Sequence, residues 1–138
     1  MRIFYVIIFL LLKINYLYGN SNFYLEGVSH FEKQEFNKAK FKFEQDIVFN
    51  PKSELSYLYL SKIFNRQDKK DLEEQNLNTV MLLNPKNEEA IYNLAKLKLD
   101  SSDFKKSEEL NDKLMSLCNN FCEKSKKLKK EIENLSKK

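Results

Sequence analysis

Glycine and proline are scarce in this chain of 138 residues, which contains two of each. Proteins built of many short strands need both residues at their turns, so the scarcity favours helices joined by short connections. Gly19 and Gly27 are the only glycines, and two residues so placed do not form a glycine-rich phosphate-binding loop. The composition therefore predicts an all-α protein.

Histidine occurs only once, at position 30. A lone histidine without Cys, Asp or Glu at ligand spacing is a weak metal candidate, and no neighbouring residue completes a nucleophile–His–acid arrangement. Because His30 lies among apolar residues of a predicted helix, we interpret it as a core side chain. We expect no catalytic residue, no metal site, no cofactor and no enzyme activity.

The body of the chain also lacks an excess of basic residues. The formal charge of the whole chain is +4, of which residues 1–21 supply +2 and the tail 123–138 supplies +4, so the region between them carries −2. Nucleic-acid-binding domains are usually basic, with the charge gathered on one face. We therefore expect no nucleic-acid partner. The abundance of Lys, Asn, Ile, Phe and Tyr points to an AT-rich, bacterial genome.

One long hydrophobic run is present, the ten residues Ile3–Leu12 near the amino terminus. A membrane-spanning helix needs about 20 apolar residues. A signal peptide needs a basic start, about 7–15 apolar residues and a cleavage site with small residues. Gly19 and Ser21 provide such a site. Residues 1–21 are therefore predicted to be a signal peptide cleaved after Ser21 or Gly19.

The alternative is an uncleaved anchor, because apolar residues continue beyond Lys13. Residues 3–18 would then hold the protein in the inner membrane. In both cases residues 22–138 lie outside the cytoplasm, in the periplasm or the extracellular medium.

The two prolines mark a repeat. Asn50-Pro51 and Asn84-Pro85 are 34 residues apart. Proline lacks an amide hydrogen and disfavours helix at the preceding residue, so each Asn-Pro ends a helix. A fixed period of this length is typical of a solenoid of helix pairs. We expect three pairs, at about 20–53, 54–87 and 88–121, with turns inside the pairs at 34–35, 67–68 and 101–103.

The apolar and small residues within this period resemble the tetratricopeptide repeat over residues 22–120. The matching positions are Phe23, Gly27, His30, Ala39, Phe43 and Pro51 in the first copy; Tyr57, Leu60, Ser61, Phe64, Leu77 and Pro85 in the second; and Ile91, Leu94, Ala95, Ser107 and Leu114 in the third. The resemblance implies an all-α, right-handed solenoid of about three helix-turn-helix repeats of 34 residues, followed by a capping helix over 122–138.

Several positions depart from the family pattern. Asp46 and Glu73 stand where the repeat usually has small, buried residues, and Cys118-Asn119 replaces the third Asn-Pro. These departures predict irregular packing, mainly around the second copy.

Cys118 and Cys122 are the only cysteines. An even number of cysteines downstream of an export signal favours a disulfide. A redox role would call for a two-residue spacing and a thioredoxin-type strand pattern, and neither is present. We therefore expect a structural bridge that holds the capping helix.

The tail from residue 122 is rich in lysine and places Leu128, Ile132 and Leu135 on one helix face. Its basic side admits two interpretations, a solvated face or a weak contact with anionic lipid, which is worth about 1 kcal/mol per lysine near the surface.

The resemblance also implies where a partner would bind. In this family the first helix of each pair lines an inner groove for a peptide or a helix. The corresponding residues are Tyr24, Val28, Phe31, Leu58, Lys62, Asn65, Arg66, Tyr92, Asn93 and Lys96. We expect Lys62, Arg66 and Lys96 to form a basic strip that pairs with acidic groups. The predicted function is that of an extracytoplasmic scaffold that binds a protein or peptide.

Two other functions are kept as alternatives. One is a membrane-anchored structural subunit or oligomerising spacer of an envelope complex. The other is an enzyme of an unrecognised type, for which a metal or substrate at His30 would be the sign.

Overall fold

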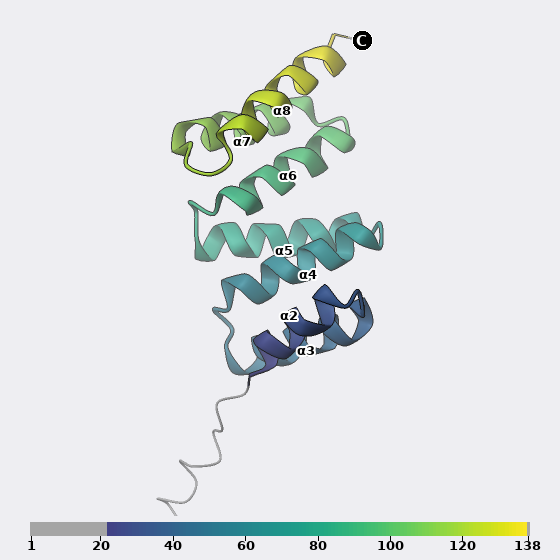
Figure 1. Ribbon diagram of the computed structural model, residues 1–138. Coiled ribbons are helices and arrows are strands. Elements are labelled where there is room, and N and C mark those ends of the chain that lie inside the picture. The colour runs from purple at the N-terminus through teal and green to yellow at the C-terminus, as the bar shows by residue number, and fades with distance from the viewer. Residues whose placement is uncertain (1–21, 138) are drawn as a thin grey trace, which may run out of the picture.

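The computed structural model of this chain describes residues 22–137, so the predicted export segment 1–21 lies outside the described residues. Within that range all regular structure is helical, in seven helices. They are α2 (Phe23–Glu32), α3 (Phe36–Phe49), α4 (Glu54–Arg66), α5 (Lys70–Leu83), α6 (Glu88–Asp100), α7 (Phe104–Leu117) and α8 (Cys122–Leu135). The pairs α2/α3, α4/α5 and α6/α7 stack in chain order, and α8 closes the far end (Figure 1). The predicted all-α solenoid is confirmed.

Each turn inside a helix pair has the same geometry. Gln34, Asp68 and Ser102, again 34 residues apart, all adopt the left-handed conformation, with φ of 60°, 53° and 60°. After each of them an amide donates back across the helix end, from Glu35 to the carbonyl oxygen of His30 and at the equivalent residues of the next two pairs. This is the bond pattern of a Schellman motif, which usually has glycine at the left-handed position. Non-glycine residues fill this position in a chain that is poor in glycine, and the predicted turns are confirmed.

The paired helices cross at positions that hold small residues. Gly27 is buried on α2, and a Cβ atom added to it would lie 2.6 Å from Cε1 of the Phe43 ring on α3. In the third pair, Ser107 of α7 donates a hydrogen bond of 2.8 Å to the carbonyl oxygen of Ala95 on α6. Glycine, serine and alanine at these crossings allow the two backbones to approach closely.

The core has two parts. The first lies between α2, α3 and α4 and consists of Ala39, Phe43, Leu60, Ile63 and Phe64, with Tyr24, Val28, Phe31 and Tyr59 packed against it. The second runs from α4 to α8. The stacked rings of Phe43 and Tyr59, 4.9 Å apart, join the first pair to the second.

Buried polar residues also join the first two pairs. Asp46, one of the departures from the family pattern, accepts a hydrogen bond of 2.6 Å from Ser56 on α4, and both side chains are buried. Burial of a polar group costs little when it is hydrogen-bonded. Asp46 therefore forms a polar contact between the first and second repeats.

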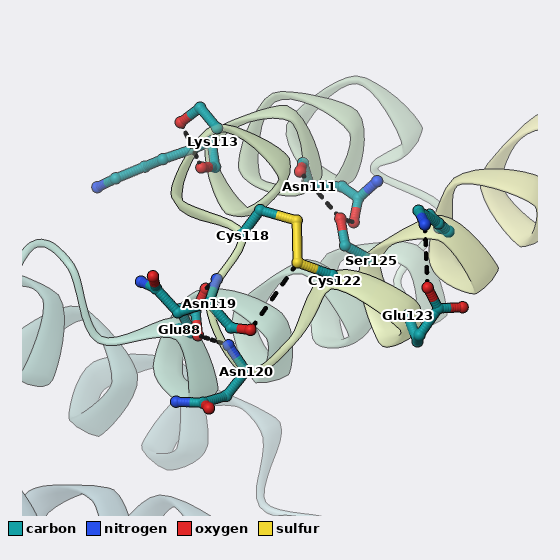
Figure 2. The surroundings of a disulfide bond; sticks show 11 residues. Glu88, Asn111, Lys113, Cys118, Asn119, Asn120, Cys122, Glu123 and Ser125 are labelled. Carbon is teal, nitrogen blue, oxygen red and sulfur yellow. Dashed lines mark hydrogen bonds and ion pairs between the residues drawn. A yellow bond between two sulfur atoms is a disulfide. The ribbon is translucent and has the colours of Figure 1, made fainter.

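A glutamate at the start of a helix holds the loop that ends the same helix pair. Glu54, the first residue of α4, accepts hydrogen bonds from the side-chain amides of Asn84 and Asn87 at 3.0 and 2.5 Å. Glu88 begins α6, 34 residues later. It accepts bonds of 2.7 Å from the backbone amides of Asn119 and Asn120 (Figure 2).

The departure at residue 119 explains why the two loops are held differently. Asn119 occupies the position equivalent to Pro85, and proline has no amide hydrogen. The second loop therefore donates through asparagine side chains, whereas the third donates through its backbone. These two amides lower the pKa of Glu88 below its ordinary value because they stabilise the carboxylate.

A disulfide closes the same loop. Cys118 ends α7 in the left-handed conformation, with φ of 40°, and its sulfur is bonded to that of Cys122, the first residue of α8 (Figure 2). Beside the bridge, Ser125 of α8 donates a 2.8 Å hydrogen bond to Oδ1 of Asn111 on α7, and both residues are buried. The bridge and this polar contact fix the start of α8 against the third pair.

The capping helix buries two of its three predicted apolar residues. Leu128 and Ile132 belong to the core, whereas Leu135, on the same side of the helix, is 39% exposed. Leu135 is the last residue of α8, beyond the last turn that packs on the third pair. Most of the lysines of the tail are exposed, and the two interpretations of its basic side both remain open.

Gly27→Ala tests the close crossing of α2 and α3. Alanine favours the helix by about 0.5–1 kcal/mol relative to glycine. The added methyl group would displace the fully buried Phe43 ring, and overpacking of this kind costs about 1–3 kcal/mol. We expect a net loss in the free energy of unfolding, measured by urea denaturation. The control is Ser29→Ala on the exposed side of α2, which should not destabilise the protein. A Gly27→Ala protein that is as stable as that control would contradict the close crossing.

Candidate functional site

A groove of about 770 Å³ runs along the first helices of the second and third pairs. Its walls come from α4 and α6, and α2 and α5 each contribute one side chain. The lining residues are Phe31, Ser61, Lys62, Asn65, Arg66, Glu73, Glu89, Tyr92, Asn93, Lys96, Leu97 and Asp100. The groove has the size of a small-ligand or peptide-side-chain site, and polar groups line most of it.

Seven of the ten predicted groove residues line it. They are Phe31, Lys62, Asn65, Arg66, Tyr92, Asn93 and Lys96. Leu58 does not, because it is only 4% exposed and belongs to the core. Tyr24 and Val28 also lie elsewhere: they pack against the core of the first pair. The first pair therefore contributes less to the groove than the sequence suggested.

The predicted basic strip is largely neutralised inside the protein. Nζ of Lys62 lies 2.8 Å from the Glu89 carboxylate, and Nζ of Lys96 lies 2.9 Å from that of Glu131 on α8. Burial lowers the pKa of Lys96, but the bond and the charge of Glu131 outweigh this effect and raise it overall. Both lysines thus already have carboxylate partners.

Arg66 has a different environment. Its guanidinium lies over the rings of Phe31 and Phe36, 5.7 and 5.0 Å from their centres. A guanidinium stacks well on aromatic faces, which holds the side chain flat against the wall of the groove. The partners of the Arg66 side chain in the groove are therefore two aromatic rings, those of Phe31 and Phe36.

Glu73 was not among the predicted groove residues, although its position was noted as unusual. It stands where the first and third pairs have the buried residues Ala39 and Ser107, and it is only 4% exposed. Both of its carboxylate oxygens lie 3.1 Å from Nδ2 of Asn65. Burial raises the pKa of Glu73, and the nearby Asp100 raises it further, whereas the Asn65 bond and Lys70 act in the opposite direction.

The remaining lining residues were missed for a common reason. Glu89, Leu97 and Asp100 lie on α6, and Ser61 lies at a helix crossing, where the repeat pattern predicts packing alone. The family pattern marks which helix lines the groove, but not how far round that helix the opening extends.

Known structures share this fold. A tetratricopeptide domain of Spaghetti (RPAP3), bound to the HSP90 peptide SRMEEVD, matches with a TM-score of 0.73 and 15% sequence identity. The match covers 83% of this chain and 90% of that chain. The secretion chaperone SycD of Yersinia enterocolitica, in complex with a peptide of the translocator YopD, matches at 0.74, with 16% identity and 84% and 92% coverage. The TPR2B domain of yeast Sti1 in its pHsp70 complex also matches at 0.74, with 14% identity and 80% and 93% coverage.

This chain has the tetratricopeptide-repeat fold. The resemblance seen in the sequence is thereby confirmed at the level of fold. No protein-family model matches the sequence, and no curated protein matches it either.

His30 does not fill the core of this tetratricopeptide domain as predicted. Its side chain is 27% exposed, and Nδ1 lies 2.5 Å from Oε2 of Glu35, just beyond the first turn. The polar ring turns toward the carboxylate at the helix end, because that contact satisfies its nitrogen. Residues 22–137 contain no group of three His, Cys, Asp or Glu side chains placed to hold a metal ion. Among the helices of this range, none combines the length and the apolar character needed to cross a membrane.

Glu73→Gln tests the environment of the buried carboxyl group. The folded protein holds the Glu73 proton more tightly than the unfolded chain, so between the ordinary pKa of 4.5 and the raised value the stability of the wild type falls as the pH rises. Glutamine keeps the acceptor for Asn65 and carries no charge. We expect the variant to be more stable than the wild type at pH 7, with the difference shrinking as the pH falls toward 4.5, as measured by thermal unfolding.

The matched control is Glu108→Gln on the exposed side of α7. Its melting temperature should follow that of the wild type at every pH. A Glu73→Gln protein that is less stable than the wild type at pH 7 would show that the carboxylate is compensated in the folded protein.

Proposed function

We propose that this protein is an exported interaction module that binds a peptide segment of a partner protein in the groove between α4 and α6. The observation that carries the proposal is the groove itself, which combines ring surfaces with amide and charged groups over the first helices of successive repeats. An extended peptide is recognised by such a combination, because rings contact its side chains and amides bond to its backbone. The activity is binding, and it involves no covalent chemistry.

The structural comparisons support the same class of function. Two of the similar structures, at 15% and 16% identity, are described as complexes with peptides, of HSP90 and of the translocator YopD. At this identity the partners themselves do not carry over to the present chain. The shared feature is an extended concave surface formed by stacked repeats, which is the usual binding face of solenoid proteins.

Two groups in the groove suit backbone recognition. The side chain of Asn93 makes no hydrogen bond with another described residue, so both ends of its amide are open to a peptide. Tyr92 packs on Phe121, with ring centres 5.6 Å apart, and Lys124 lies over both rings. α8 therefore helps to shape the groove, as it does through Glu131.

Export rests on the sequence of residues 1–21, and the disulfide supports it. A bond between Cys118 and Cys122 persists in oxidising compartments and is rare in the cytosol. We propose that the domain works in the periplasm or outside the cell, after cleavage near Ser21. The alternative of an anchored subunit predicts that residues 3–18 remain in the purified protein.

Asn93→Tyr tests the groove directly. The equivalent residue in the preceding repeat is Tyr59, so tyrosine is compatible with this position of a first helix, and at position 93 its ring would fill the groove. The wild-type protein is immobilised, and binders are selected from a random decapeptide library. We expect selected peptides to lose at least tenfold in affinity for Asn93→Tyr, measured by fluorescence anisotropy.

The control is Lys105→Tyr, which adds the same ring on the exposed side of α7. It should bind the selected peptides as the wild type does. If the library yields no binder, or if Asn93→Tyr retains full affinity, the groove is not a peptide site and the proposal fails.

A further inference from the structure

The charges of the groove are unevenly partnered. Among the described residues, Lys62 and Lys96 are ion-paired with Glu89 and Glu131, and Arg66 rests on two aromatic rings. None of the ion pairs among residues 22–137 involves Glu73 or Asp100, which line the same groove. Arg66 has no ion pair in that range either, so the groups without one are one cation and two acids, and their net charge is negative, the opposite of what the sequence suggested.

Of the two acids, Glu73 has the greater need of a partner, because its side chain is buried. An ionised carboxylate offers about four acceptor sites on its two oxygens. In this domain one nitrogen, Nδ2 of Asn65, serves both oxygens at 3.1 Å, although the residue is 96% buried. A buried charge is costly unless a partner of opposite sign compensates it. The structure thus places a buried carboxylate in the lining of an open groove, with acceptor sites that Asn65 alone does not fill.

Asp100 lines the same groove from α6. It is the last residue of α6, is exposed and lies close enough to Glu73 for its charge to oppose the ionisation of Glu73. Two carboxylates from different helices thus face one space. A cation bound in this space would relieve their repulsion.

No cation among residues 22–137 forms an ion pair with Glu73. Asn65 on α4 is a neutral donor, and Asp68 in the turn and Asp100 on α6 are acids. The charge of Lys70, at the start of α5, favours the ionised form of Glu73 without forming an ion pair with it. The protein itself therefore leaves this position for a ligand.

We propose that Glu73 and Asp100 form a subsite for a lysine or arginine side chain of the bound peptide, an inference that rests on the proposed function of the groove. The cationic head would enter beside Asn65 and donate to the carboxylate of Glu73 from the open side. Its apolar stem would lie against apolar side chains of the lining, to which Phe31 of α2 and Leu97 of α6 belong. Charge-assisted hydrogen bonds of this kind are about twice as strong as neutral ones and are geometrically selective.

A basic side chain suits this position better than other ligands. A free metal ion would need several oxygen ligands, and no group of three candidate ligands exists in residues 22–137. An acidic peptide, as first expected from Lys62, Arg66 and Lys96, would have to displace Glu89 and Glu131 and then face two carboxylates. A lysine or arginine needs no such displacement.

The peptides selected on the wild-type protein, and shown by Asn93→Tyr to bind in the groove, provide the probe. We expect these sequences to share a lysine or arginine at one fixed position. In a synthetic peptide, norleucine in place of lysine or citrulline in place of arginine at that position should weaken binding by about tenfold or more, because a charge-assisted bond is lost.

Substitutions in the protein should reproduce this loss. Glu73→Gln and Asp100→Asn should each weaken the basic peptide and bring its affinity toward that of the neutral analogue, whereas Glu108→Gln on α7 should change neither affinity. The neutral analogue should bind wild type and Glu73→Gln alike, which separates loss of the charge contact from a change in fold.

The outcomes separate the two claims. If peptides bind in the groove but have no fixed basic residue, or prefer acidic residues, the subsite is wrong while the groove stands. If basic peptides bind Glu73→Gln and Asp100→Asn as tightly as the wild type, the subsite is also overturned. If nothing binds in the groove, the proposed function has failed before this test.

Discussion

The close crossing of the two helices in each pair is the constraint on which the solenoid depends. Positions 27, 61 and 95 on the first helices are Gly, Ser and Ala, and all three are buried. Bulk at these positions would separate the helices, as the 2.6 Å approach of an added Cβ atom to Phe43 indicates. The left-handed turns at Gln34, Asp68 and Ser102 set each second helix back against its first. The 34-residue period in the sequence is the repetition of this one contact.

At the second pair a charged residue enters this otherwise small and uncharged set. The positions that face the crossing from the second helices are Ala39, Glu73 and Ser107. Ser107 satisfies its hydroxyl on a backbone carbonyl, but a glutamate is too long and too polar to end there. Its carboxylate reaches Asn65 and the groove instead. Glu73, which packs less well at the crossing than a small residue, thereby becomes part of the candidate site. Positions that depart from the residue types expected for the fold are often functional.

The far end of the stack depends on contacts of a different kind. The loop before α8 has no proline, and its backbone amides bind Glu88 where the preceding loop uses asparagine side chains on Glu54. The disulfide lies in the same loop. Because α8 supplies Glu131 to Lys96 and Lys124 to the ring of Tyr92, the position of this helix affects the charge and shape of the groove. The loop and the groove are thus parts of one arrangement.

Most of the fold could be predicted from the sequence, because Asn-Pro spacing and apolar periodicity act locally. The helix pairs, their turns and most buried residues follow from those signals. The site was predicted less completely. The pattern identified α4 and α6 as the lining helices, but Leu58 was assigned to the groove although it faces the core. The ion pairs of Lys62 and Lys96 join residues 27 and 35 positions apart, and local patterns carry no information about such partners. His30 was misplaced for a similar reason, since its partner Glu35 lies beyond the turn.

The central claim is that the groove is lined by a buried carboxylate, that of Glu73, with which no cation of residues 22–137 forms an ion pair. Titration of the Glu73 side chain, followed through its carboxyl carbon by NMR, tests this claim most directly. The account predicts a pKa above the ordinary value of 4.5, because burial and Asp100 outweigh the bond from Asn65. A pKa of 4.5 or below would mean that Glu73 is already compensated in the folded protein, and it would contradict the account.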